Sequence, residues 1–138
     1  HGFYKLEVQS LEKTAPEGLY ELKVLEVRIG TEKDKQKIEA EKNYLEAIID
    51  YGKGTSEFYR NAREKLQNAS ELFKAMGEKV KEADSLLLAG FISENLGEKS
   101  VALEFYNKAL PLFQFLNNKE QEAITLNNIG RVYDELNE

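Results

Sequence analysis

The 138-residue sequence contains no cysteine and no tryptophan, two prolines, and a single histidine, His1. Without cysteine the chain has no disulfide, no thiol nucleophile and no cysteine-ligated zinc site. One histidine at the chain terminus also leaves no Ser/His/Asp or Cys/His set for nucleophilic catalysis. The many carboxylates stand three or four residues from lysines on expected helices, a spacing typical of surface ion pairs. We therefore predict a protein that is not an enzyme, with no catalytic, cofactor-binding or metal site.

Long apolar runs and an excess of basic residues are also lacking. No run approaches the ~18–20 apolar residues that a membrane-spanning helix needs, and no signal-peptide pattern opens the sequence. The net charge is −6, from 25 acidic and 19 basic residues. The densest lysine cluster, at 31–37, alternates with acids, so it forms no basic surface. We predict neither membrane insertion nor nucleic-acid binding, and the sequence indicates no cellular compartment.

The first thirty residues have the apolar spacing of β-strands. In the segments 2–11 and 19–29, apolar and polar residues alternate, which is typical of half-buried strands. The alternation switches phase at Leu25, which indicates either a bulge or a strand covered on both faces. Between the two segments, "TAPEG" at 14–18 has the composition of a turn. We predict a β-hairpin over residues 1–30.

From Thr31 to the end the apolar spacing is helical. Thr31 with Asp34 has the pattern of a helix N-cap, as does Thr55 or Ser56. Glycine and asparagine interrupt the pattern at short intervals, and the helices expected between them cover 31–51, 55–76, 78–96, 99–116 and 120–137. Helices joined by turns this short pack as antiparallel neighbours. The predicted fold is mainly α, an antiparallel helical-hairpin solenoid of about five helices preceded by the β-hairpin.

The helical region contains an internal repeat with a period of 40 residues. Identical residues recur at this offset, for example Ala62/Ala102, Ala69/Ala109, Phe73/Phe113, Ala83/Ala123, Leu86/Leu126 and Gly90/Gly130. A fixed period of this length is typical of solenoids, in which each unit buries its apolar faces against its neighbours. The small residues, including Gly90 and Gly130, are expected where two helices approach closely.

The segment "LLLAGFISENLGEKSVALEFYNKALPLF" at 86–113 resembles a tetratricopeptide repeat. The residues at the signature spacings of that family are Leu86, Ala89, Gly90, Ala102, Tyr106 and Ala109, and "LNNIGRVY" at 126–133 restarts the pattern. The resemblance implies a degenerate first unit at 31–76, a second repeat at 78–116, and the first helix of a third, incomplete repeat at 120–138. The 40-residue period departs from the usual 34.

The 40-residue variant is similar to long bacterial arrays that often precede a caspase-like (CHAT-type) peptidase domain. The hairpin resembles the closing strands of a pre-peptidase C-terminal β-sandwich, so 1–30 would be the remnant of such a domain. This resemblance implies a non-catalytic scaffold that binds a protein or peptide. Two alternatives remain open, a regulatory arm of a larger CHAT-type protease and a purely structural spacer.

In the tetratricopeptide family the first helix of each repeat forms the concave binding face. The positions that this resemblance assigns to the face are Asp84, Leu87, Phe91, Glu94, Ile124, Asn127, Arg131 and Asp134. Leu87 and Phe91 would place apolar surface where the repeat does not bury it. Asn127 can donate to and accept from a peptide backbone. The alternative is that all eight are ordinary exposed residues.

The last helix has an apolar stripe formed by Leu126, Ile129, Val132, Tyr133 and Leu136. Residues 99–116 alone cannot cover all of it, so we expect the chain to be a piece of a longer array whose next helix covers this stripe. Burying one such side chain is worth about 1.5–3 kcal/mol. We therefore predict that the chain forms a two-fold homodimer in which either the terminal helices or the hairpins cover one another. The alternative is a monomer whose last helix frays or folds back.

Overall fold

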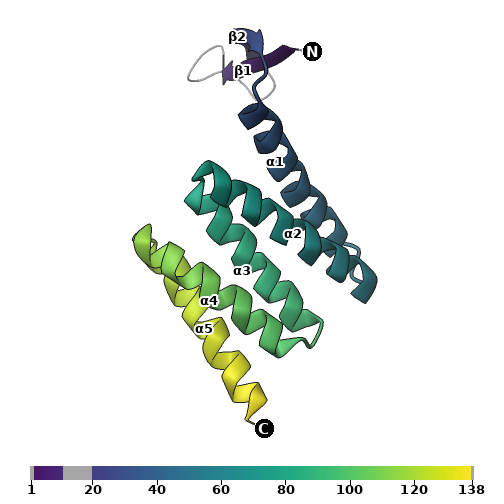
Figure 1. Ribbon diagram of the computed structural model, residues 1–138, viewed down its shortest axis with the longest axis vertical. Coiled ribbons are helices and arrows are strands. Elements are labelled where there is room, and N and C mark those ends of the chain that lie inside the picture. The colour runs from purple at the N-terminus through teal and green to yellow at the C-terminus, as the bar shows by residue number, and fades with distance from the viewer. Residues whose placement is uncertain (1, 11–19, 138) are drawn as a thin grey trace. The chain divides into compact units, whose positions relative to one another are not determined.

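The computed structural model describes residues 2–10 and 20–137 (Figure 1). It contains two strands and five helices in the described ranges: β1 (Gly2–Ser10), β2 (Tyr20–Ile29), α1 (Glu32–Tyr51), α2 (Ser56–Met76), α3 (Lys79–Asn95), α4 (Lys99–Phe115) and α5 (Lys119–Leu136). The chain divides into two compact units, residues 1–35 and residues 36–138. The predicted mainly helical fold is confirmed, and the helix bounds lie within two residues of those expected.

In the first unit, β1 and β2 pair as antiparallel strands, from Gly2 opposite Ile29 to Ser10 opposite Tyr20. The register shifts once, because Lys5 pairs with Glu26 whereas Leu6 pairs with Val24. Leu25 is therefore the extra residue of a bulge, at the point where the sequence alternation changes phase. The turn predicted at 14–18 lies outside the described residues.

Two helices begin with hydroxyl side chains that accept from backbone N–H groups. At α1, the Asp34 N–H donates to Thr31 Oγ1 (3.2 Å) and the Thr31 N–H donates to Asp34 Oδ2 (2.8 Å), which completes a reciprocal cap. At α2, the Phe58 N–H donates to Thr55 Oγ1 over 3.4 Å. Both caps were predicted from the sequence. Each satisfies donors that the helix itself leaves unpaired.

The turns that end α2, α3 and α4 share one geometry. Gly77, Gly97 and Asn117 stand 20 residues apart and have left-handed φ angles of 75°, 74° and 53°. In each turn the next N–H donates to a carbonyl five residues earlier: Glu78 to Phe73 (2.9 Å), Glu98 to Ser93 (2.9 Å) and Asn118 to Phe113 (3.0 Å). This is the Schellman helix end, and its recurrence reverses the chain at a constant interval.

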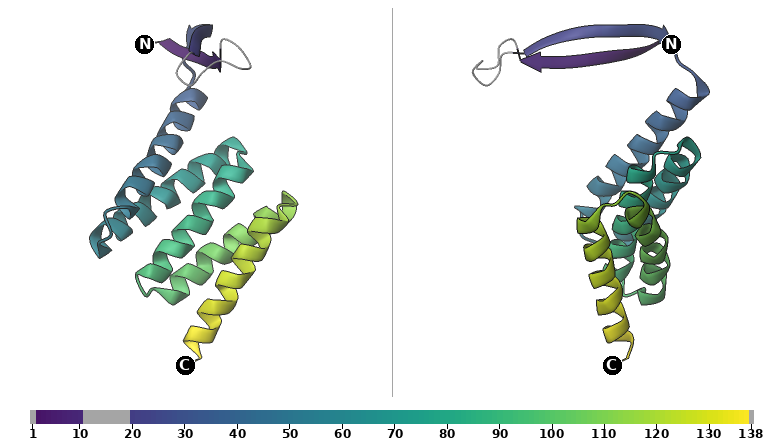
Figure 2. Two further views of the ribbon diagram at one scale, coloured as in Figure 1. Left: turned by 180° about the vertical axis from the view of Figure 1, so that it is seen from behind. Right: turned by 90° about the vertical axis from the view of Figure 1, so that its left-hand side faces the viewer.

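In the second unit, α3 packs between α2 and α4, and α5 packs on α4 (Figure 1; Figure 2). One apolar cluster joins the first four helices and includes Ala47, Leu66, Leu86, Ile92, Phe105 and Phe113. A second cluster joins α1 and α2 around Phe73. A third joins α4 and α5 around Tyr106 and Val132. No helix in the described ranges is long and apolar enough to cross a membrane.

Residues 40 positions apart occupy matching places in α2 and α4. Ala62 and Ala102 are fully buried, as are Ala69 and Ala109, and Phe73 and Phe113 are at most 1% exposed. In α3 and α5, the Ser85 and Thr125 hydroxyls are both buried and donate to the carbonyl four residues earlier over 2.7 Å. These packed helical hairpins are compatible with a helical repeat.

The two repeat glycines differ in their surroundings. A Cβ atom at Gly90 would lie 2.5 Å from Tyr106 Cε1, so only glycine allows α4 to approach α3 this closely. At Gly130, apart from the glycine, its chain neighbours and the adjacent backbone of α5, no described atom lies within 4 Å of that position. The prediction of a close crossing is therefore wrong for Gly130, because no described helix packs on that side of α5.

Candidate binding groove

A groove of about 460 Å³ runs between α1, α3 and α5. Its lining residues are Tyr44 from α1, Asp84, Leu87, Leu88 and Phe91 from α3, and Gln121, Ile124 and Asn128 from α5. Four of the eight predicted site residues are thus brought together: Asp84, Leu87, Phe91 and Ile124. The volume lies within the range of pockets that hold small molecules or single side chains of a partner.

The floor of the groove is one face of α3. Asp84, Leu87, Leu88 and Phe91 are spaced three or four residues apart, so they project from the same side of the helix. Leu87 and Leu88 also pack against the large apolar cluster, and Leu87 against the α4–α5 cluster. Packing against two clusters fixes this floor in place before any partner binds.

Aromatic rings connect the groove to the loop end of α1. The Phe91 ring meets the Tyr51 ring edge-on, with 6.1 Å between centroids and 62° between planes. Tyr51 in turn stacks on Tyr59 of α2 at 5.2 Å. Contacts of this kind add about 0.5–1.5 kcal/mol each beyond area burial. Phe91 is therefore half-buried and held in position while part of its ring faces the groove.

Asp84 is a half-buried carboxylate that makes no hydrogen bond and no ion pair with any residue of the described chain. Desolvation raises the pKa of its carboxyl group above the ordinary value of 3.8. The pKa of the neighbouring Tyr44 hydroxyl is also raised, first by burial and second by the charge of Asp84. Water and protein thus solvate this carboxylate poorly.

Asp84 and Tyr44 also line a smaller hollow of about 350 Å³ that adjoins the groove. This hollow contains one further carboxylate, Glu41, and one cation, Lys81. Lys81 Nζ donates to Glu41 Oε1 over 2.6 Å, so these two charges neutralise each other. Neither relieves the unpaired charge on Asp84.

Two predicted site residues are engaged in a contact between helices. Arg131 Nη2 of α5 lies 2.9 Å from both carboxylate oxygens of Glu94 on α3. The Tyr106 hydroxyl of α4 donates to Glu94 Oε2, also over 2.9 Å. Burial and this carboxylate together raise the pKa of the Tyr106 hydroxyl above its ordinary value of 10.0. Glu94 therefore ties three helices together, and neither Glu94 nor Arg131 lines the groove.

The other two predicted residues, Asn127 and Asp134, are exposed and lie outside the lining. Sequence reasoning missed four lining residues: Tyr44, Leu88, Gln121 and Asn128. Three of them stand one helical turn from a predicted residue, Leu88 after Asp84 and Gln121 and Asn128 on either side of Ile124. Helical spacing could have found these three. No signal pointed to Tyr44, because the helix at 31–51 matches the repeat poorly.

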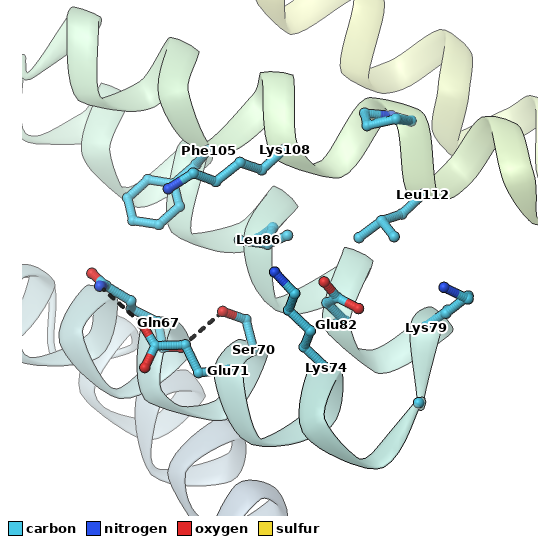
Figure 3. A pocket seen from close by; sticks show the side chains of 12 residues that line it. Gln67, Ser70, Glu71, Lys74, Lys79, Glu82, Leu86, Phe105, Lys108 and Leu112 are labelled. Atoms are coloured by element: carbon cyan, nitrogen blue, oxygen red, sulfur yellow. Dashed lines mark hydrogen bonds between the residues drawn. The ribbon is translucent and has the colours of Figure 1, made fainter.

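A second hollow, also of about 460 Å³, opens between α2, α3 and α4 on the opposite face of α3 (Figure 3). Lysine and glutamate side chains surround it: Lys74, Lys79, Lys108, Glu71 and Glu82. Lys79 lies over the Phe115 ring and Lys108 over the Phe105 ring. Its charges are of mixed sign, three lysines against two glutamates, so we assign this hollow no ligand.

Within the described ranges, no group of three or more His, Cys, Asp or Glu side chains is placed to hold a metal ion. The groove contains one carboxylate, two amides and one phenol, among apolar side chains. This set can hydrogen-bond a partner and exclude water from it. No family model, no curated protein and no solved structure matches the chain.

Proposed function

We propose that the helical unit is a non-catalytic interaction module of the tetratricopeptide type, which binds a protein or peptide segment in the groove between α1, α3 and α5. The observation that carries this proposal is the groove itself, because α3 and α5, whose sequences match at the 40-residue offset, line it together with α1. The buried small residues at 62, 69, 102 and 109 and the close contact at Gly90 support the repeat class.

The lining suits a peptide better than a small polar metabolite. Leu87, Leu88, Phe91 and Ile124 offer apolar surface, and Ile124 is 41% exposed. Covering such surface is favourable by about 25 cal/mol per Å². The amides of Gln121 and Asn128 each carry both donors and acceptors, so they can satisfy a peptide backbone that loses its water.

Selection of a phage-displayed library of random 12-residue peptides on the 138-residue chain tests this proposal. Hydrogen exchange with the most enriched peptide should show protection in α3 and α5. The Phe91→Ala and Ile124→Ala variants should each weaken binding at least several-fold with unchanged helicity. The control Lys108→Glu changes the second hollow and should bind normally. Peptides that protect only that hollow, or no enrichment at all, would contradict the proposal.

We also propose that the chain self-associates through α5. Leu126, Ile129, Tyr133 and Leu136 recur at intervals of three and four residues, so they form one stripe along the helix. Leu126, Tyr133 and Leu136 are 47–52% exposed, whereas Val132 is buried against α4. A second copy related by a two-fold axis presents the same stripe, so each covers the other.

Light scattering over a dilution series measures this association. The chain of 15.8 kDa should show twice its mass at high micromolar concentration and return to one chain on dilution. The variant Leu126→Lys with Tyr133→Lys should stay monomeric throughout, because charged side chains would be desolvated in the interface. A single-chain mass for the unaltered protein at high concentration, with α5 ordered, would refute the dimer.

A further inference from the structure

The groove and the adjoining hollow contain one charge that nothing balances. Glu41 pairs with Lys81 at 2.6 Å. At the far end of α3, Glu94 pairs with Arg131 at 2.9 Å. Of the carboxylates that line the groove and the hollow, only Asp84 has no ionic partner among the described residues, and it lies where these two cavities meet. The binding surface therefore presents an unbalanced negative charge beside apolar side chains.

We propose that Asp84 makes the groove selective for a peptide segment in which a lysine or arginine side chain adjoins a large apolar side chain. The inference rests on the proposed peptide-binding function and adds the chemistry of the partner. The apolar side chain would lie on Leu87, Phe91 and Ile124, while the cation pairs with the carboxylate. Charge complementarity, rather than apolar area alone, identifies the partner.

The surroundings of Asp84 increase the energetic effect of a cation. Half-burial removes part of the carboxylate's hydration, as the raised pKa of that group shows. A partner cation would replace the lost hydration with charge-assisted hydrogen bonds, which are roughly twice as strong as neutral ones. Arginine suits the site best, because its planar guanidinium can donate two hydrogen bonds to one carboxylate.

The same charge disfavours acidic partners. A glutamate or a chain-terminal carboxylate beside Asp84 would place like charges together in a partly desolvated site. The one cation that lines the adjoining hollow, Lys81, already forms an ion pair with Glu41. The net charge of −6 acts in the same direction, since it favours encounter with basic segments over acidic ones.

The test repeats the random 12-residue peptide selection with unaltered chain and with the Asp84→Asn variant. The unaltered chain should enrich peptides that carry lysine or arginine next to Leu, Ile, Phe or Trp. Asp84→Asn should lower the affinity of those peptides about tenfold or more, because it removes a charge-assisted hydrogen bond from the complex. The matched control Glu104→Gln removes an exposed carboxylate on α4, outside the groove, and should bind normally.

A second measurement changes the peptide and compares its binding to the unaltered chain and to Asp84→Asn. Replacing the basic residue of the best peptide by leucine should cause a similar loss on the unaltered chain and almost none on Asp84→Asn. Groove-binding peptides without basic residues, indifferent to Asp84→Asn, would overturn the selectivity and leave the interaction module intact. If no enriched peptide responds to Phe91→Ala or Ile124→Ala, both the module and its selectivity are overturned.

Discussion

α3 and α5 have matching sequences 40 positions apart, yet they differ in how much of each helix is covered. On one side the two agree, because Ser85 and Thr125, and likewise Ile92 and Val132, are fully buried. On the other side they differ: Leu86 is 7% exposed and Leu126 is 48% exposed. Ala83 is likewise buried, whereas Ala123 is exposed. In α3 a following helix covers that side, and in α5 none of the described residues does.

The difference in exposure between α3 and α5 shows which features depend on the sequence of a helix and which depend on the helices packed against it. Both helices follow the same left-handed turn and bury an equivalent hydroxyl, although only α5 has a side-chain N-cap, from Asn118. Helix formation therefore needs only the preceding neighbour. Burial of the second side needs a following helix, and identical residues there are exposed without it. The proposed repeat architecture would have this property, since the stability of a repeat protein is a sum of units and interfaces between neighbours. Matched substitutions in the two helices measure the contribution of that second interface.

The largest effect is expected at the leucine pair. Leu86→Ala removes a side chain from the main apolar cluster and should lower the free energy of unfolding by about 2–5 kcal/mol. Leu126→Ala should cost less than about 1 kcal/mol for the monomer, because half of that side chain is already in water. Urea unfolding at low micromolar concentration measures both. Equal losses would show that Leu126 is covered in the monomer.

The glycine pair should respond with opposite signs. Gly90→Ala places a methyl group 2.5 Å from the ring of buried Tyr106 and should destabilise by about 1–3 kcal/mol. Gly130→Ala meets no atom within 4 Å and should stabilise α5 by about 0.5–1 kcal/mol, because alanine loses less backbone entropy. Thermal melts of both variants measure these changes in stability. A neutral Gly90→Ala would mean that α3 and α4 separate more easily than their packing indicates.

The glycines also show how far the sequence alone could go. Helix number, bounds and caps were predictable, because apolar spacing, Gly, Asn, Thr and Asp act locally. The need for glycine at position 90 was predictable from the repeat. The exposure of Gly130 was not, because it depends on whether another helix follows. Long-range pairing was equally hidden, so Glu94 and Arg131 were assigned to the groove although each neutralises the other.

Asp84 differs from Glu94 and Arg131, because it lines the groove and has no ionic partner among the described residues. The family pattern placed it on the binding face, and the structure brings it to the groove lining. Its lack of a partner could not be inferred, because Lys81 stands only three residues away in the sequence. That lysine instead pairs with Glu41, 40 residues earlier in the chain. An unbalanced charge becomes visible only when every neighbouring pair has been placed.

The junction between α1 and α2 combines apolar and ionic contacts. Besides the apolar cluster around Phe73, an ion-pair cluster at Lys65 joins these two helices. Its Nζ lies 2.7 Å from Asp50 and 3.0 Å from Glu46, and Lys53 also donates to Asp50. Hydrogen bonds from Lys53 and Lys65 hold the pKa of the Asp50 carboxyl below its ordinary value of 3.8. The same contacts raise the pKa of the Lys65 ammonium above 10.5.

These shifts predict stability at both ends of the pH range. Asp50 stabilises the fold above its unfolded pKa, and this contribution is lost as pH falls through its lower folded pKa. Lys65 stabilises below 10.5 and loses its contribution as pH rises through its higher folded pKa. Asp50→Asn should therefore lower the melting temperature at pH 7, by less than Gly90→Ala does, and should lower it less at pH 3, below the ordinary carboxyl pKa of 3.8. The control Glu104→Gln should change neither, and an equal deficit at both pH values would contradict this account.

The smallest effect is expected at the turns, where two glycines contrast with an asparagine. Gly77, Gly97 and Asn117 hold the same left-handed position, and only Asn117 has a Cβ atom there. That conformation costs most residues about 1–2 kcal/mol, and asparagine somewhat less. Asn117→Gly should therefore raise stability by up to about 1 kcal/mol, since the greater flexibility of glycine in the unfolded chain offsets part of the gain.

The reciprocal variant Gly97→Asn should lower stability by a similar amount, and Gly97→Ala should lower it more. Melting curves of the three variants measure these differences. A loss at Asn117→Gly would show that the asparagine side chain, rather than its backbone angle, stabilises the turn between α4 and α5.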